Sequence, residues 1–385
     1  MVDLQSDVQG IVQSIQQFIQ NLQISTSSLT PEAKKLYLNL NTHELIDEAR
    51  NLYILGNYSL SRMLLLEVLN TLFNTLEKNK CINPLIDALY TFAWTWQETG
   101  DFDIATKLFN KQLALSHAVR YPLGQANAYN GLATVAHKCG YFNPAIEYYE
   151  RSLMIKKQLD NPISIAVAYN NIATNLRMLG YYDMALDKLE QAKEIFNASE
   201  ENKDRNLAFV FGNMSGVLCE KGDLDAALDL STKCLQSCLA GGVGGMDFVE
   251  FLQFHGHLWY SKGDFQKALD TLLECERKTR ELKTNKLDLL ILLCHLLIDM
   301  NRLKKAQDYL TKVETLLKKH ETVRDWALYL FARAELDNKR GLDQTEVEYY
   351  YLQAKRFAET LSFFRLQVLT RLALSRLNIR QLKFN

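Results

Sequence analysis

Gly140-Tyr141-Phe142-Asn143-Pro144-Ala145 is the stretch that decides the fold, because close copies of it recur along the chain. Two of the copies are Gly100-Asp101-Phe102-Asp103-Ile104-Ala105 and Gly180-Tyr181-Tyr182-Asp183-Met184-Ala185. With Asn301 in the one gap, the glycine recurs at intervals of 38 to 44 residues: Gly56, Gly100, Gly140, Gly180, Gly222, Gly263 and Gly341. A nearly fixed period of this length predicts one supersecondary unit copied in series.

One unit illustrates the predicted hairpin. Residues 125–139 carry apolar side chains at a helical period, and Gly140 ends this helix because glycine accepts the left-handed backbone that closes a helix. Asn143 is expected to cap a second helix with Pro144 at its first position, and Asn161-Pro162 begins the next unit. The pattern therefore predicts an all-α chain of antiparallel helix pairs joined by tight turns.

This arrangement resembles the tetratricopeptide repeat, in which an aromatic residue follows the turn glycine by two positions and an alanine follows it by five. The aromatic positions hold Tyr58, Phe102, Phe142, Tyr182 and Phe265, with Leu224 and Leu303 as aliphatic substitutes. The alanine positions hold Ala105, Ala145, Ala185, Ala227, Ala268 and Ala306. The resemblance covers residues 42–360 and implies a right-handed superhelical solenoid of about eight hairpins.

The first and last units depart from this pattern. Ser61 replaces the alanine, and after Gly341 the motif shifts to Val347; end repeats commonly differ because one face meets solvent. Units of this length look like those of Pins-type scaffolds, kinesin light chains, MalT-type sensors and Rap-type regulators, which bind peptides or protein segments, or sense an effector, on the concave surface. The resemblance therefore implies a non-catalytic scaffold or adaptor, with a Rap-like effector-sensing regulator or a self-assembling subunit as alternatives.

The two flanking segments, residues 1–41 and 361–385, are expected to be helical caps. Residues 1–24 predict an amphipathic helix, which either caps the first repeat or packs on another copy and forms a homo-oligomer. A polar connector at 25–29 and a new helix from Thr30 follow it. Residues 361–385 carry five basic residues and no acidic one. We expect a capping helix with a solvated basic face, the alternative being a basic amphipathic element for an acidic partner or an anionic membrane. The apolar stripe of the first helix consists of Leu4, Val8, Ile11, Ile15, Phe18 and Leu22.

Composition excludes several classes of function. The net charge of −1 gives no field that attracts nucleic acid. Residues 1–30 lack a secretory signal and no window holds 18 unbroken apolar residues, so we expect a cytoplasmic protein without a membrane association. The seven cysteines lack zinc-site spacing, and buried free thiols in a reducing compartment are expected. We expect no cofactor.

Counting back from each turn glycine places equivalent residues of the first helices in register. Ten, nine, six and three residues before it, the central repeats carry amides, hydroxyls and basic groups. In tetratricopeptide folds the first helix of each pair lines the concave face, so these residues are the candidate peptide-binding set: Asn130, Thr134, His137, Asn170, Asn171, Thr174, Arg177, Asn213, Gln253 and His257. Asparagine offers a donor and an acceptor to an extended peptide backbone. The alternative is an exposed face of merely solvated polar residues.

The remaining features refine the partner and argue against catalysis. His137, Lys138 and Arg177 give the central repeats positive character, which favours an acidic segment or a terminal carboxylate. No nucleophile lies in a recognisable pattern with a base. The glycine run at 241–245 lacks the following lysine of a phosphate loop, so we expect a flexible connection there. The partner is therefore expected to be a protein or peptide.

Overall fold

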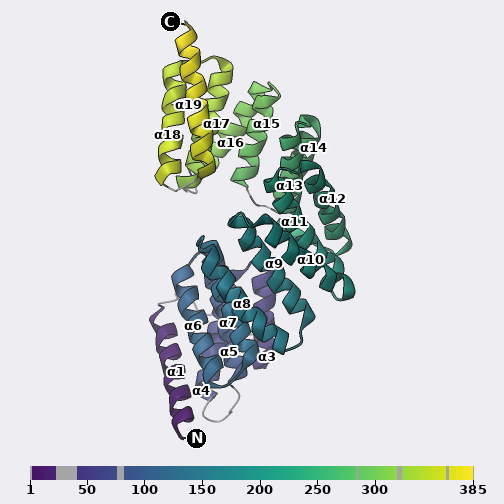
Figure 1. Cartoon of the computed structure of the whole chain (residues 1–385). Helices are drawn as coiled ribbons and strands as arrows, with labels where there is room; N and C mark the ends of the chain where they lie inside the picture. Colours follow the sequence, from purple (N-terminus) through teal and green to yellow (C-terminus); the bar gives the residue numbers. More distant parts are fainter. Residues whose placement is uncertain are drawn as a thin grey trace. The chain divides into compact units, whose positions relative to one another are not determined.

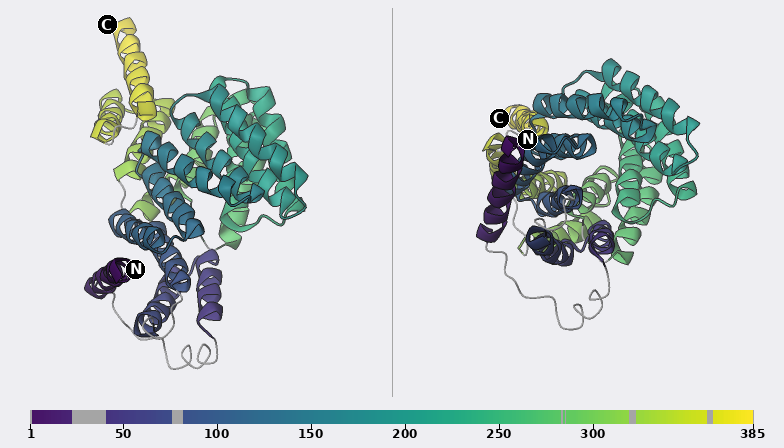
Figure 2. Two further views of the ribbon diagram at one scale, coloured as in Figure 1. Left: turned by 60° about the horizontal axis from the view of Figure 1, so that its bottom comes forward. Right: turned by 90° about the horizontal axis from the view of Figure 1, so that it is seen from below.

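The computed structural model describes residues 2–22, 41–75, 82–282, 284, 286–318, 323–360 and 364–384. It divides into two compact units, Met1–Glu201 and Asn202–Asn385, and each is treated by itself below. Every secondary-structure element in the described residues is a helix (Figures 1 and 2). The connector at 25–29 and the helix start at Thr30 lie outside the described residues.

The described helices of each unit are as follows. The first unit contains α1 (Val2–Asn21), α3 (Thr42–Ile54), α4 (Tyr58–Thr75), α5 (Asn83–Glu98), α6 (Phe102–Ala118), α7 (Pro122–Lys138), α8 (Phe142–Gln158), α9 (Pro162–Met178) and α10 (Tyr182–Ala198). The second contains α11 (Lys203–Lys221), α12 (Leu224–Ala240), α13 (Gly245–Lys262), α14 (Phe265–Glu281), α15 (Leu287–Asp299), α16 (Leu303–Leu317), α17 (Val323–Arg340), α18 (Gln344–Thr360) and α19 (Phe364–Phe384). From α3 to α18 they pack as consecutive hairpins, four in each unit, which confirms the expected eight (Figure 1).

The turn inside each hairpin has the expected backbone. Gly140 adopts a φ of 81° and Asn301, in the one gap of the glycine series, a φ of 57°. Both values lie in the left-handed region that glycine and asparagine tolerate best. The second helix then begins two residues after the turn residue, as α8 does at Phe142. The expectation that Asn143 caps this helix is wrong: the cap is Tyr141, which makes no side-chain capping bond, and Asn143 and Pro144 lie inside the first turn of α8.

The connections between hairpins contain a second left-handed residue that the sequence pattern did not reveal. Arg120, Asp160, Asn202 and Gly242 all have positive φ values, between 49° and 64°. They recur at about the period of the turn glycines, but three of the four are not glycine. Asp160, Asn202 and Gly242 are of the types that tolerate this backbone best, but Arg120 is not, so residue identity gives only a partial signal for it.

The motif alanine lies in the interface of each hairpin. All six are fully buried: Ala105, Ala145, Ala185, Ala227, Ala268 and Ala306. In the first hairpin Ser61 is equally buried, and its hydroxyl donates a hydrogen bond of 2.7 Å to the carbonyl of Ala49 on α3. In the last hairpin Val347 is fully buried and α18 begins at Gln344, which confirms the expected shift of the motif.

The flanking helices pack on specific hairpins. Helix α1 lies along α6, the second helix of the second hairpin, with Ile15 fully buried (Figure 1). Lys111 on α6 donates a hydrogen bond of 3.1 Å to the carbonyl of Ser14. Helix α19 packs on α18 with Leu366 and Leu377 buried. None of the described helices is both long and apolar enough to cross a membrane.

Lys156 on α8 is a buried cation, and it yields a stability prediction. The residue is only 7% exposed, and burial lowers the pKa of its amine from 10.5 to about 8. Between these two pKa values the unfolded chain binds more protons, so stability rises with pH from about 8 to 10.5. Replacing Lys156 with methionine is expected to raise the free energy of unfolding at pH 7 by about 1–3 kcal/mol. Urea denaturation at pH 7 and pH 10.5 measures this, and a gain that persists undiminished at pH 10.5 would contradict the explanation.

Candidate peptide-binding face

The first helices of the hairpins in the first unit touch one another through side chains. Tyr53 on α3 packs edge-to-face on Trp94 of α5, with 6.5 Å between ring centroids. Lys138 on α7 donates to the carboxylate of Glu98 on α5 at 3.1 Å. His137 on α7 makes a hydrogen bond of 3.0 Å with Asn175 of α9. The helices α3, α5, α7 and α9 therefore form a common face.

Three positions of each first helix share one side of that helix. Residues ten, six and three before the turn glycine lie within about 60° of one another around the axis, because each residue of an α-helix advances about 100°. On α7 and α9 these positions hold the six residues that we call the polar stripe: Asn130, Thr134 and His137, followed by Asn170, Thr174 and Arg177. All six are half-buried.

The polar stripe on α7 is held by neighbours on three helices. The hydroxyl of Thr134 bonds to the carbonyl of Asn130 and lies 2.9 Å from the hydroxyl of Tyr149 on α8. Burial raises the pKa of Tyr90 on α5, and the nearby amide of Asn130 partly offsets the shift. The side-chain oxygen of Asn130 is buried without a hydrogen-bond partner among the described residues. This oxygen therefore has a defined position but no hydrogen-bond donor.

The polar stripe on α9 is fixed by its own helix. The hydroxyl of Thr174 donates to the carbonyl of Asn170 at 3.1 Å. Asn171 lies about 100° round the helix from Asn170. At the equivalent position of α7, a Cβ on Gly131 would meet the ring of Phe109 on α6. Asn171 therefore stands at a position that faces the preceding hairpin, beside the stripe and not in it.

The other three candidate residues belong to the second unit. The amide of Gln253 on α13 donates a hydrogen bond of 3.1 Å to Asp288 on α15. The ring of His257 stacks on Phe254, with 6.4 Å between centroids. Asn213 on α11 is half-buried. Seven of the ten candidates therefore lie in the first unit, on α7 and α9, and three lie in the second.

The positive character expected of the central repeats is smaller than the sequence implied. Lys138 forms an ion pair with Glu98, so its charge is largely compensated. Asn175 was not among the candidates, although it is 1% exposed and links α7 to α9 through His137. Its amide also donates to the carbonyl of Asn171 at 2.8 Å. The signal for it was weak, because asparagine stands five residues before the turn glycine in just one other repeat, at Asn51.

The histidines of the second unit have structural neighbours. His255 bonds to the hydroxyl of Ser231 and accepts from the indole of Trp259, so it points away from His257. Burial lowers the pKa of His295 to about 4, and its ring packs on Phe331. Within the described residues, no group of three or more His, Cys, Asp or Glu side chains is placed to hold a metal ion.

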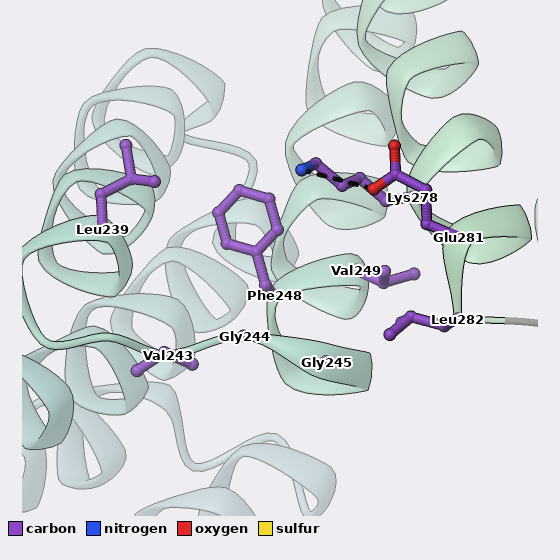
Figure 3. Close-up of a pocket in the computed structure, with 9 residues that line it drawn as sticks. All are labelled: Leu239, Val243, Gly244, Gly245, Phe248, Val249, Lys278, Glu281 and Leu282. Carbon is purple, nitrogen blue, oxygen red and sulfur yellow. Dashed lines mark ion pairs between the residues drawn. The ribbon is translucent and has the colours of Figure 1, made fainter.

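The glycine run at 241–245 borders an apolar recess of about 260 Å³. Figure 3 shows the Phe248 ring with Leu239 on one side and Val249 and Leu282 on the other. The helix that follows begins at Gly245, with Gly244 as its cap. A recess lined mainly by apolar side chains suits an apolar group better than a phosphate.

Comparisons with known proteins agree with this architecture. No curated protein sequence matches the chain. A Rap protein complexed with competence and sporulation factor has a TM-score of 0.59 at 13% identity, covering 89% of this chain and 99% of that one. The apo form of RapI has a TM-score of 0.58 at 11% identity, covering 89% and 98%. The apo form of the quorum sensor NprR from B. thuringiensis has a TM-score of 0.53 at 15% identity, covering 97% and 99%.

At these identities the similarity to solved structures shows the fold alone. Two family models, both described as tetratricopeptide repeat, match residues 126–159 and residues 164–240. These segments contain α7 to α12, including the polar stripe. The turn glycines and buried alanines extend the same hairpin design over the other described repeats. The chain therefore carries tetratricopeptide repeats and shares the helical-repeat fold of these solved structures.

Proposed function

We propose that the common face of the first unit binds an extended peptide segment of another protein, and that the chain acts through this binding and not through catalysis. The observation that carries the proposal is the unsatisfied side-chain oxygen of Asn130 on a helix that His137 joins to α9. A buried acceptor without a partner costs about 1–3 kcal/mol. When the amide turns toward the common face, a backbone N–H of a bound peptide recovers that cost.

The chemistry of the stripe suits a peptide more than a small apolar ligand. Asparagine and threonine side chains match the alternating donors and acceptors of an extended backbone irrespective of its side chains. Arg177 favours a carboxylate, from an acidic residue or from a chain end, because its guanidinium makes two parallel hydrogen bonds. The Rap structure in complex with a competence and sporulation factor supports a peptide ligand on this architecture.

The first experiment compares wild type with the variant Asn130→Ala/Asn170→Ala/Arg177→Ala, all three in the polar stripe, in affinity capture from native lysate. We expect the partner to bind the variant at least about tenfold more weakly, because charged and neutral hydrogen bonds are lost together. Circular dichroism checks that the variant folds. The matched control is Glu147→Ala/Glu150→Ala/Lys157→Ala, which removes three exposed side chains of α8. Equal capture by wild type and by the folded stripe variant would contradict the proposal.

A regulator that responds to a bound effector is the second candidate. The observation that favours it is that the Rap and NprR structures align over 89–97% of this chain. In both candidate functions the polar stripe holds the ligand. The two functions differ in whether ligand binding changes what another part of the chain does. Deleting residues 1–24 separates them: loss of regulation with unchanged peptide affinity supports the regulator, and loss of oligomerisation supports a self-assembling subunit.

A further inference from the structure

A second recess lies in the second unit, between α14, α15 and α16. Its volume is about 450 Å³, within the usual range for a site that holds a small molecule. Two buried leucines, Leu289 and Leu290, line its apolar side together with Leu316. Its other side is polar, with threonine hydroxyls and charged groups from α14, from α16 and from the segment that leads into α15.

Cations outnumber carboxylates in this recess. Arg280, Lys286 and Lys312 line it, and Glu276 is the one acidic residue in the lining. The carboxylate of Glu276 is already satisfied by a hydrogen bond of 2.7 Å from the hydroxyl of Tyr309. The lining therefore carries two more positive than negative charges, and Glu250, which pairs with Lys286 from outside the lining, reduces this excess to one.

Arg280 and Lys312 form ion pairs with Glu276 that are too long to be hydrogen bonds. The nitrogen-to-oxygen distances are 3.5 Å for Arg280 and 3.7 Å for Lys312. Both exceed the range of about 2.7–3.2 Å for a hydrogen bond between nitrogen and oxygen. Lys286 lies 3.7 Å from Glu250, outside the lining, and it is the residue directly before the N-terminus of α15. All three side chains therefore keep donors for a further acceptor, and the helix terminus favours a negative one.

The preceding repeat shows that the hairpins form such a recess without the basic side chains. The apolar recess of Figure 3 lies at the corresponding place, between α12, α13 and α14. Leu239 lies 17 residues after its turn glycine there, and Arg280 lies 17 residues after its own. The following helix is preceded by Gly244 in one recess and by Lys286 in the other. The hairpins form the recess with either lining, so the basic residues are not explained by packing.

We propose that the recess between α14, α15 and α16 binds a small organic oxyanion. A phosphate or carboxylate group contacts Arg280, Lys286 and Lys312, and the apolar part of the same molecule lies against Leu289, Leu290 and Leu316. Arg280 orients the group because its guanidinium offers paired donors, and the lysines act as point charges. Glu276 limits the affinity of the recess for the anion by electrostatic repulsion. Replacing Glu276 therefore tests the proposal.

Isothermal titration calorimetry on the full chain tests this site with hexyl phosphate, hexanoate and the neutral hexanol. We expect one site for an anion, no heat with hexanol, and weaker binding as the salt concentration rises. Whether hexyl phosphate or hexanoate binds more tightly identifies the head group. The variant Arg280→Gln/Lys312→Gln is expected to bind at least about tenfold more weakly. The control Lys278→Gln, in the apolar recess, is expected to bind as wild type does.

A second variant keeps the proposal testable if the double variant does not fold. Glu276→Gln removes the competing carboxylate but keeps a group that accepts from Tyr309, and it is expected to bind the anion several-fold more tightly. If wild type binds neither anion, or if the folded double variant binds as tightly as wild type, the proposal is overturned. Weaker binding by Glu276→Gln would overturn it too.

Discussion

Replacing Gly131 with valine is expected to lower the free energy of unfolding of the first unit by about 3–5 kcal/mol. A Cβ placed on Gly131 of α7 would lie 2.3 Å from a ring carbon of Phe109 on α6. The ring cannot move aside, because Phe109 is fully buried and packs against Tyr90 and Trp94 of α5, with centroids 6.1 and 5.9 Å away. Valine adds three carbon atoms where there is no space for one.

Urea denaturation followed by tryptophan fluorescence measures this effect, since Trp94 and Trp96 report on the same hairpins. Substitutions of two other glycines serve as controls. They separate the effect of a lack of space from the effect of backbone strain. A Cβ on Gly10 in α1 meets nothing within 4 Å, so Gly10→Ala is expected to be neutral or to stabilise by about 0.5–1 kcal/mol. Gly140→Ala is equally open but keeps a φ of 81°, and a cost of about 1–2 kcal/mol is expected. An unchanged midpoint for Gly131→Val would show that α6 and α7 do not pack as described.

Replacing Arg333 with methionine is expected to destabilise the second unit by about 3–5 kcal/mol. Asp337, one turn later on α17, is 1% exposed and forms an ion pair with Arg333 at 2.5 Å. Its second oxygen is buried without a hydrogen-bond partner in the described part of the chain. Without Arg333 a buried carboxylate loses its one charged partner, and an uncompensated buried charge is far more costly than a missing surface ion pair.

The double variant Arg333→Met/Asp337→Leu provides the control for this ion pair. Two apolar side chains of similar volume often replace a buried ion pair with little loss, so most of the stability is expected to return. Thermal denaturation of wild type and the three variants completes the cycle. If the double variant is as unstable as the sum of the two single variants, the pair is not coupled and the assignment of the ion pair is wrong.

The sequence predicted the hairpins because their determinants are local. The left-handed turn at Gly140 and the buried Ala145 follow from residue identity and spacing alone, and both are confirmed. The cap at Asn143 was mispredicted. Asparagine followed by proline is typical of a helix start, but the turn after Gly140 already begins the helix at Phe142. The boundary between the two units follows Glu201, in a connection where Ser199 is extended and the glycine interval reaches 42 residues. This interval is two residues longer than the two before it, and that difference is too small to predict a boundary between units.

The contacts of the candidate residues could not be predicted from the sequence. Register counting placed Asn130, Thr134 and His137 on one side of α7, and that this side binds a peptide stays a prediction. Register counting did not distinguish Asn171 from the residues of the polar stripe. Asparagines at repeated positions give the same sequence pattern whether they face a ligand or the preceding helix. Register counting also missed the compensation of Lys138 by Glu98, two residues 40 apart that meet only through repeat stacking. Contacts between repeats are non-local and leave little trace in a single sequence.

Site-specific photo-cross-linking tests most directly whether the polar stripe binds a peptide. A benzophenone amino acid placed at Thr174 lies in the stripe, and one placed at Met154 lies on α8, where the side chain is 66% exposed. After incubation with native lysate and irradiation, the cross-linked partner is identified by mass spectrometry. The proposal predicts that a partner cross-links from position 174 and not from position 154. A partner that cross-links from position 154 and never from position 174 would contradict it.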